Sequence, residues 1–481
     1  MNRLLFGGLV ALTILLPASV YGQDYYTDVR PVLTANCLAC HTETGPAWSM
    51  ADPETTFERS RLIAAMVLDR LMPPWIAEPG HQTYLDDPTL DPEVLAMIRR
   101  WREAGFPRGE PRPDAAAPAP ASHGAGAHGG GHGSAHGHGF GPDLTLDVLP
   151  GISFLPNQDS PDDYRCFVVD WTEARPGYVT GFRARPGNLQ VAHHVVVHAV
   201  EPDLAARFRE LEEEEEGPGY QCFGGALPDR LGQRAVREAY DARYPDGVRE
   251  LSRGNFWLAH WAPGMDGHVF PEGTGIRMEP GSALVVQMHY YGGAAPGERD
   301  EGSMVDFMLA EQVERPAFHF PQTRGDWLVA ERNRTMVIEP GATETYEVRD
   351  PLEELLPYIS YVTQVPEDRI AGLEVHSVNL HMHAFGHAGK VSLTDRTGRK
   401  ETLLSIPRWD LRWQRDFTFA APKVFARNAL RGVTLTAECT FRNPTEQTVV
   451  GGYGSFDEMC FNFAYIAVQV DTEAGEETGG R

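Results

Sequence analysis

The chain has 481 residues, with 42 Lys and Arg against 67 Asp and Glu, so its formal net charge is −25. At roughly 150 residues per domain, this length allows about three domains. The excess of negative charge excludes the basic surfaces that bind nucleic acid or an anionic membrane, so we expect neither as a partner.

The N-terminus has the pattern of a secretory signal peptide. Residues 1–22 start with a basic Arg3, continue with an apolar run over 4–16, and end in small residues up to Gly22. A membrane anchor is the alternative interpretation, but the run is too short to span a bilayer. The pattern therefore predicts an exported protein, periplasmic or secreted, that is not membrane-spanning.

Residues 23–108 are predicted to form a small all-α domain. A first helix is expected over 26–36. Apolar side chains recur at helical spacing between 56 and 71, and Asp91 is placed to cap a further helix.

Within this region Cys37, Cys40 and His41 form a Cys-x-x-Cys-His motif. In this motif the two thiols attach haem covalently, and the adjacent histidine is placed to ligate its iron. A redox-active disulfide is the alternative for a bare Cys-x-x-Cys, but the histidine and the export signal favour haem. The segment resembles small c-type cytochrome domains, so we expect one covalently bound haem c.

The second axial ligand of this haem is expected to be Met72, which follows a predicted helix and precedes two prolines. The resemblance to c-type cytochrome domains favours this position. A thioether ligand also suits electron transfer, because it raises the haem potential. Met50 and Met66 are the alternatives.

Residues 109–143 change in composition to Pro and Ala, and then to Gly with interspersed histidines. Such a composition cannot bury a core, so this segment is predicted to be a flexible linker. His-rich tracts can also bind metal. The sequence leaves open whether the linker binds metal or acts as a tether alone.

From residue 144 onward the pattern is that of β-strands. Short runs of Val, Ile, Leu, Phe and Tyr are separated by Gly, Pro, Asp and Asn. About 330 residues of this pattern exceed one sandwich, so we expect an N-terminal β-sandwich over 144–316 and a C-terminal one over 317–475. Helices are expected over 204–215 and 233–243. The clearest predicted strands are 190–200, 284–291, 375–383, 433–441 and 461–470.

The chain has six cysteines, and an even number in an exported protein suggests disulfide bonds. Two of the six belong to the haem motif. For the other four, the order along the chain predicts the pairs Cys166–Cys222 and Cys439–Cys460, each within one β domain.

Several histidines fall in predicted strands. His381 and His383 are two residues apart, so they share one face of a strand and can bind one metal ion. The adjacent His193 and His194 would point to opposite faces of an ideal strand, so they can share an ion only at a bulge or a strand end. His289 lies in a further predicted strand.

Four motifs resemble, in their order along the chain, the copper type II, ascorbate-dependent monooxygenases. This family includes peptidylglycine α-hydroxylating monooxygenase and dopamine β-monooxygenase. The motifs are His193-His194, Met288-His289-Tyr290, His381-Met382-His383 and Asp457-Glu458-Met459-Cys460. The resemblance covers roughly residues 144–470, and it implies two jelly-roll β-sandwiches with one copper ion on each.

Carried over residue by residue, the resemblance implies two sets of copper ligands. The set expected to bind the electron-transfer copper is His193, His194 and His289. The set expected to bind the copper that meets oxygen is His381, His383 and Met459. Imidazole serves both oxidation states of copper, whereas a soft thioether favours Cu(I).

The expected function is therefore that of a copper-dependent monooxygenase, which hydroxylates a C–H bond of a small organic substrate with O2. Electrons would come from an ascorbate-like reductant or a redox protein, relayed by the fused haem and entering at the three-histidine copper. The alternative is a non-catalytic electron-transfer or copper-handling protein on the same fold. The amidating members hold a substrate carboxylate with an Arg where this chain has Asn379, so a free carboxylate is not the expected substrate.

Overall fold

The computed structural model describes residues 23–38, 41, 48–85, 87–111, 140–160, 162–222, 225–245, 247–261, 265, 267–291, 295–328, 335–452 and 456–471. The predicted signal peptide and residues 112–139 of the predicted linker lie outside the described residues. The chain divides into two compact units. The N-terminal unit contains the described residues up to Pro73 and again from Pro88 to 111, and the β unit contains 74–87 and all residues from 140 onward.

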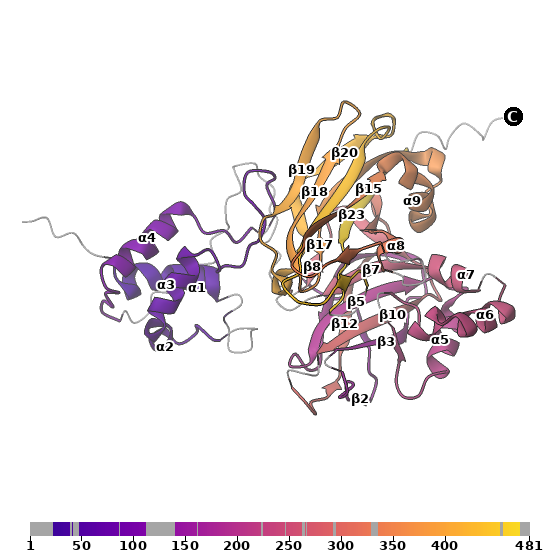
Figure 1. Cartoon of the computed structure of the whole chain (residues 1–481), viewed down its shortest axis with the longest axis horizontal. Helices are drawn as coiled ribbons and strands as arrows, with labels where there is room; N and C mark the ends of the chain where they lie inside the picture. The colour runs from indigo at the N-terminus through magenta and orange to yellow at the C-terminus, as the bar shows by residue number, and fades with distance from the viewer. Residues whose placement is uncertain are drawn as a thin grey trace, which may run out of the picture. The chain divides into compact units, whose positions relative to one another are not determined.

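The N-terminal unit is helical (Figure 1). Its elements are a π-helical turn η1 (Tyr25–Val29) and the helices α1 (Arg30–Cys37), α2 (Pro53–Glu58), α3 (Ser60–Leu68) and α4 (Pro92–Glu103). Helix α2 starts at a proline because this residue has no N–H to leave unpaired, and the Asp52 side chain caps the helix by accepting from the Thr55 N–H at 2.7 Å. The apolar faces of these helices meet around Trp101, which is fully buried.

Three sheets form most of the β unit. The largest has ten strands: β1 (Leu144–Asp147), β12 (Met304–Ala310), β4 (Gly177–Arg185), β9 (Thr274–Met278), β13 (Arg315–Gln322), β23 (Phe461–Val470), β16 (Ile370–Val378) and β20 (Phe417–Ala426) in that spatial order, with β8 (His268–Val269) on β4 and β17 (Leu380–His381) on β23. The second has the order β6 (Tyr220–Gln221), β3 (Asp162–Asp170), β10 (Ala283–Tyr291), β5 (Ala192–Val200) and β7 (Asn255–Trp261). The third has the order β15 (Thr343–Pro351), β21 (Thr434–Arg442), β18 (Gly386–Thr394) and β19 (Lys400–Ile406).

The smaller elements complete the β unit. Two short ladders pair β2 (Ser153–Phe154) with β11 (Asp300–Glu301) and β14 (Val337–Ile338) with β22 (Val449–Val450). Single 3-10 turns lie at Asp229–Gly232, Leu352–Leu355, Glu367–Arg369, Leu411–Trp413 and Arg427–Ala429. No helix among the described residues is long and apolar enough to cross a membrane.

The ten-stranded sheet contributes to two hydrophobic cores, one shared with the five-stranded sheet and one with the four-stranded sheet. Strand β23 shows why, because its successive side chains point to opposite faces. Ala464 and Ile466 lie in the second core, whereas Tyr465 and Ala467 lie in the first. The predicted β-sandwich character is confirmed, and the two sandwiches are joined by one continuous sheet, since β13 pairs with β23.

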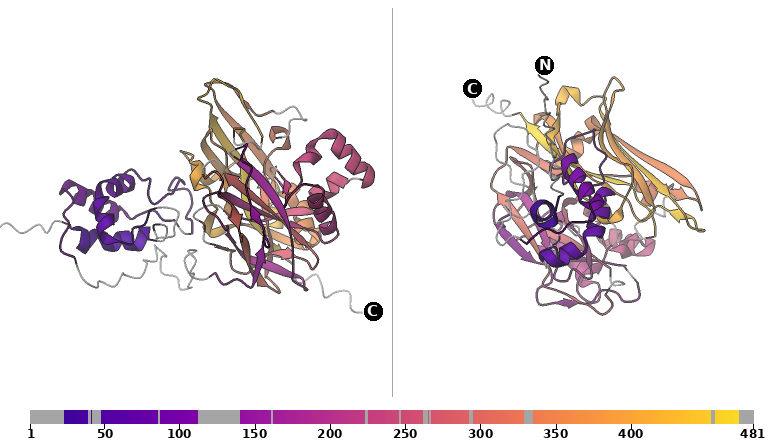
Figure 2. Two further views of the ribbon diagram at one scale, coloured as in Figure 1. Left: turned by 90° about the horizontal axis from the view of Figure 1, so that it is seen from below. Right: turned by 90° about the vertical axis from the view of Figure 1, so that its left-hand side faces the viewer.

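Helices cover the outer face of the five-stranded sheet. Helices α5 (Ala205–Glu213), α6 (Arg234–Arg243) and α7 (Gly247–Arg253) lie together beside β3 and β10 (Figures 1 and 2). The first two correspond to the predicted helices 204–215 and 233–243, and α7 was not predicted. Two further helices, α8 (Gly325–Leu328) and α9 (Leu356–Thr363), flank the second core.

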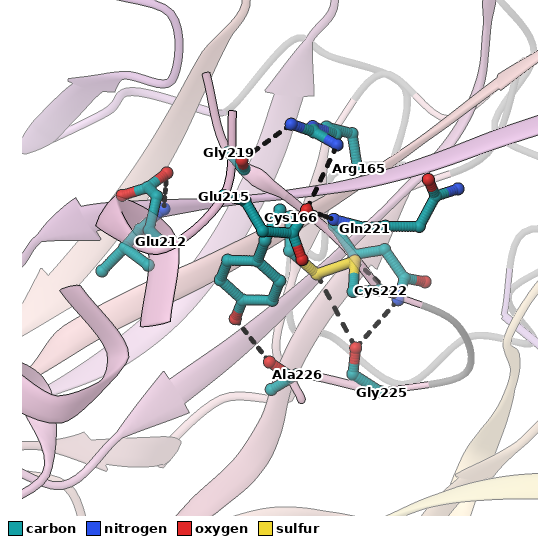
Figure 3. The surroundings of a disulfide bond; sticks show 12 residues. Arg165, Cys166, Glu212, Glu215, Gly219, Gln221, Cys222, Gly225 and Ala226 are labelled. Carbon is teal, nitrogen blue, oxygen red and sulfur yellow. Dashed lines mark hydrogen bonds and ion pairs between the residues drawn. A yellow bond between two sulfur atoms is a disulfide. The ribbon is translucent and has the colours of Figure 1, made fainter. Parts of the chain in front are cut away.

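The two predicted disulfides are both present in the β unit. Cys166–Cys222 joins β3 to the residue after β6 (Figure 3). Close to it, the Tyr220 hydroxyl donates to the Ala226 carbonyl at 2.5 Å. Cys439–Cys460 joins β21 to the residue that precedes β23.

Removing the Cys439–Cys460 disulfide is expected to lower the free energy of unfolding by about 2–5 kcal/mol. Both sulfur atoms are fully buried in the second core, so a Cys439→Ser, Cys460→Ser double variant also places two hydroxyl groups in an apolar environment. The measurement is urea unfolding of the metal-free protein. An unchanged unfolding midpoint would contradict the prediction.

Residues 74–87, here called the strap, leave the predicted N-terminal domain and pack on the second sandwich. Tyr84 forms an antiparallel bridge with Phe419 of β20, and its hydroxyl donates to the Leu403 carbonyl of β19 at 2.6 Å. Strands β19 and β20 are the last strands of their sheets. The strap therefore covers two sheet edges that would otherwise expose unpaired backbone groups.

Candidate metal centres in the cleft of the β unit

A cleft of about 1450 Å³ opens in the β unit, and strands of both sandwiches line it. Most of its lining is apolar or aromatic, but histidines and a methionine gather along it. Among its lining residues are His193, His194, His198, Trp257, His260, Asn379, His381, His383, Gln414, Met459 and Phe463.

His193, His194 and His289, here called the three-histidine group, have one ring nitrogen each within 4.8 Å of one another. His193 and His194 lie at the start of β5, and the register of β10 against β5 shifts directly after His289. Because of this strand end and irregularity, the adjacent side chains of His193 and His194 can both approach His289. Such a feature was expected from the sequence if the two residues were to share an ion. The Nδ1 atoms of His193 and His289 are 3.1 Å apart.

Residues of the neighbouring strand β3 orient the ring of His289. The Nε2 atom of His289 lies 2.9 Å from the Asp162 carboxylate, and its ring stacks on Tyr164 with 4.0 Å between centroids. Because a carboxylate can only accept, His289 carries its proton on Nε2, which leaves its Nδ1 lone pair facing His193. Burial lowers the pKa of His193 to about 4, so the imidazole is neutral and able to ligate a metal ion at neutral pH.

His381, His383 and Met459, here called the Met group, line the same cleft. His381 ends β17, and the rings of His381 and His383 are 5.2 Å apart between centroids. Met382 between them is fully buried in the second core, which places the two histidines on the other side of the chain. Met459 is 6% exposed at the cleft wall.

Each histidine of the Met group is bonded through its Nδ1 atom, which leaves Nε2 as the atom that can ligate. His381 Nδ1 bonds to the Gln414 side-chain oxygen, and His383 Nδ1 lies 3.0 Å from the Asp457 carbonyl. The fully buried Glu458 accepts from the backbone N–H groups of His383 at 2.9 Å and Phe385 at 2.6 Å. Glu458 thus fixes the His-x-His turn to the segment that carries Met459.

Burial also sets the charge of the Met group. Burial first, and then the neighbouring His383, lower the pKa of His381 to about 3. Burial raises the pKa of Glu458 to about 8, against the opposing effect of its backbone donors. The site therefore offers a neutral imidazole at His381 and a thioether at Met459, donors that suit copper in its reduced state.

A third polar cluster in the cleft was not predicted from the sequence. His260 Nε2 lies 3.2 Å from the Asp416 carboxylate, and the Asn379 side-chain amide donates to the same carboxylate at 3.0 Å. The Trp257 Nε1 atom lies 3.3 Å from the other ring nitrogen of His260 and can donate to it only when His260 is neutral. The pKa of Asp416 lies well below its usual range because His260 outweighs the desolvation of the carboxyl, and that of His260 is raised in turn, against its own burial.

The haem motif lies in the N-terminal unit. His41 is 8% exposed, and its Nδ1 lies 2.8 Å from the Trp48 carbonyl, so this nitrogen donates and Nε2 can ligate. Cys37 is half-buried at the end of α1, and Cys40 lies outside the described residues. Met72 is half-buried after α3, whereas the alternative Met50 is buried in the core of the unit.

Comparison with known proteins found a family match within the second sandwich. Residues 360–478 match the family model described as the C-terminal domain of copper type II ascorbate-dependent monooxygenases. This match supports the copper monooxygenase family, whose members bind copper and use O2 and a reductant. The matched segment contains the whole Met group, whereas the three-histidine group and the N-terminal unit lie outside it.

The wider comparisons add little to this. No curated protein matches the chain. Among solved structures, the major capsid protein P2 of bacteriophage PM2 is similar at 8% identity over 68% of this chain and 98% of its own, with a TM-score of 0.23. PNGF-II is similar at 11% identity over 69% of this chain and 65% of its own, with a TM-score of 0.25. Similarities this weak say nothing about function.

Proposed function

We propose that the chain is an exported copper-dependent monooxygenase that hydroxylates a C–H bond of a small organic substrate. In this proposal the N-terminal unit is a c-type cytochrome domain, and its haem supplies electrons to the copper sites. The observation that carries the proposal is one cleft lined by His193 and His194 of the three-histidine group and by the whole Met group, with the family match over the latter.

The donor atoms fit two copper ions. Two imidazole nitrogens bound to one ion at about 2.0–2.1 Å each come to lie roughly 3 Å apart at a near-right angle. The Nδ1 atoms of His193 and His289, 3.1 Å apart, meet this condition. When bound, copper would supply the one-electron and oxygen chemistry of the reaction. The protein orients His289 through Asp162 and His381 through Gln414, and burial keeps the imidazoles of His193 and His381 neutral.

His41 of the N-terminal unit is oriented as a haem ligand would need to be. The Trp48 carbonyl fixes the tautomer of His41, in the way that partners of metal-bound histidines commonly do. Met72 is the proposed second ligand.

The cleft also bears on the substrate. The Asn379 amide donates to the Asp416 carboxylate, whose side chain is 6% exposed, so a substrate carboxylate at this position would meet a negative charge instead of a free donor. The rings of Phe463 and Trp257 pack against each other at an angle of 32°, with 4.3 Å between their centroids. We therefore propose a substrate without a carboxylate at this end, held against aromatic surface.

Metal content tests the function directly. Protein matured with haem attachment is expected to hold about two copper ions per haem iron, because the β unit offers two donor sets and the Cys-x-x-Cys-His motif attaches one haem. Elemental analysis with electron paramagnetic resonance measures this ratio. Copper-loaded protein that takes up no oxygen with a reductant and candidate substrates would instead support a copper-handling role.

The three-histidine group has its own test in Asp162→Asn. The asparagine keeps the size of the side chain but removes the charge that orients His289, so copper affinity at this group should fall by about 10–100-fold. Competition with a copper chelator measures the affinity. Asp163→Asn is the matched control, since the Asp163 carboxylate accepts from the Asn157 backbone instead. Equal affinities in both variants would show that Asp162 does not support the site.

A further inference from the structure

The strap is part of the second sandwich rather than a free connection. Besides the bridge at Tyr84, the Leu85 N–H donates to the Thr418 carbonyl and the Ala420 N–H donates to the Thr83 carbonyl, both at 2.8 Å. On the other edge, the Glu78 N–H donates to the Ser405 carbonyl at 2.7 Å. Ala77 and Tyr84 are buried in the second core, so releasing the strap would expose apolar surface.

Both ends of the strap lead back into the N-terminal unit, at Pro73 and at Pro88. The chain therefore connects the N-terminal unit to the β unit through both ends of the strap, in addition to the predicted flexible linker. The strap begins two residues after Met72, the proposed haem ligand.

Trp75, the first aromatic residue of the strap, contacts residues 414–417, whose side chains point alternately toward the strap and toward the cleft. Trp75 packs edge-to-face on Phe417 at 5.1 Å, and the Arg415 guanidinium lies 5.1 Å from the Trp75 ring centroid. Gln414 and Asp416, which alternate with these two residues, point toward the cleft instead: Gln414 bonds to His381, and Asp416 pairs with His260. Residues 414–417 thus alternate between the strap and the cleft, as in an extended chain.

This alternation connects Met72 to the Met group by a short series of covalent bonds and contacts. It runs along the chain to Trp75, across a packed contact to 415–417, along the backbone to Gln414, and through one hydrogen bond to His381. The three-histidine group is instead supported by Asp162 and Tyr164 of β3, in the first sandwich.

We propose that electrons from the N-terminal unit enter the β unit along the strap and residues 414–417, and that they arrive at the Met group. This inference rests on the proposed function. A haem held by His41 and Met72 would give up one electron in each transfer, passing from Fe(II) to Fe(III), and a copper ion held by the Met group would take it up, passing from Cu(II) to Cu(I). An external one-electron donor then reduces the haem again. Trp75 and Gln414 act as positioning residues, and the entry point differs from the three-histidine copper that the family resemblance suggested.

The attachment is tested first, without any metal. A recognition site for a specific protease is inserted between residues 112 and 139 of the full chain, and the protein is cleaved. We expect the two fragments to elute together from a sizing column, because the strap holds them. A Trp75→Ala, Tyr84→Ala double variant should separate, and Val424→Ala, an exposed substitution on β20 outside the strap contacts, should not. Separation of the cleaved wild-type fragments would overturn the proposal.

The route is tested by following the haem absorbance without oxygen. Limiting dithionite reduces the haem of the copper-loaded protein, and the haem is then reoxidised as Cu(II) accepts its electron. Trp75→Ala and Gln414→Leu should each slow this step about tenfold or more, the lower end of the effect of losing a partner of a metal-bound histidine. Trp75→Phe keeps an aromatic contact and should restore most of the rate, which separates the route from a folding defect.

Emptying one group at a time identifies the entry point. Reoxidation should persist when His289→Ala empties the three-histidine group and should stop when His381→Ala empties the Met group. The opposite result, or wild-type rates in both Trp75→Ala and Gln414→Leu, overturns the route but leaves the relay from haem to copper intact. If the wild-type haem is not reoxidised at all, the relay in the proposed function fails, and the route fails with it.

Discussion

Replacing Met459 with leucine is expected to abolish the oxygen chemistry while leaving the protein folded. Leucine has nearly the volume of methionine, so the substitution should cost less than about 1.5 kcal/mol of stability even at this buried position. What it removes is the thioether, the soft ligand that favours Cu(I). Outer partners of metal ligands already contribute about 10–100-fold, so loss of the ligand itself should lower reductant-driven oxygen uptake more than about 100-fold.

The matched control is Met382→Leu, because Met382 lies between His381 and His383 but points into the second core. It should keep oxygen uptake near the wild-type rate. Competition with a Cu(I) chelator should show one weakened site in Met459→Leu and none in the control. An oxygen uptake rate that is the same in the two variants would remove Met459 from the proposed copper site.

The sequence predicted well those features that depend on local spacing. His381 and His383 share a side because they are two residues apart, and the structure places Met382 in the core between them. The two disulfides follow from the order of the cysteines. The β character of the region follows from its alternating apolar residues and turn residues.

Contacts across the sheet could not be predicted in this way. Asp162 reaches His289 because β3 pairs with β10, across 127 residues of chain, and no local pattern in either segment encodes that register. His260 and Asp416 meet across the two sandwiches, and each looks like an ordinary loop or strand residue when read alone. A single sequence contains no signal that would have paired them.

The strap shows a different reason for failure. Its 14 residues contain two prolines and lack a helical or alternating pattern, so the sequence placed them within the helical domain and predicted no strand or helix for them. They pack instead on two sheet edges more than 300 residues away in sequence, as the bond between Gln82 and the Thr402 carbonyl shows. The strap packs there because the edge strands of the second sandwich have backbone groups left to pair. These edges exist only after the sheets have formed, so the sequence of the strap alone does not reveal them.

Asp416→Asn is expected to destabilise the metal-free protein by about 3 kcal/mol near pH 6, toward the lower end of the 3–5 kcal/mol cost of breaking a buried ion pair. The Asp416 side chain is 6% exposed, and its partner His260 is 14% exposed. The cost stays near the lower end because His260 can release its proton when the carboxylate is gone. Glu311→Gln is the matched control: it breaks the exposed ion pair with Arg175 and should change stability by less than about 1 kcal/mol.

The effect of Asp416→Asn should depend on pH in a defined direction. The pKa of His260 is raised in the folded protein, so its contribution is complete below the ordinary value of 6.5 and is lost as the pH rises through the raised value. The pKa of Asp416 is lowered, so its contribution is present above the ordinary value of 3.8 and is lost only in stronger acid. The stability difference between wild type and variant should therefore be largest between these two values and shrink as the pH rises above 6.5. Urea unfolding across this range measures it, and a difference that grows on the alkaline side would show that His260 and Asp416 do not form the ion pair described.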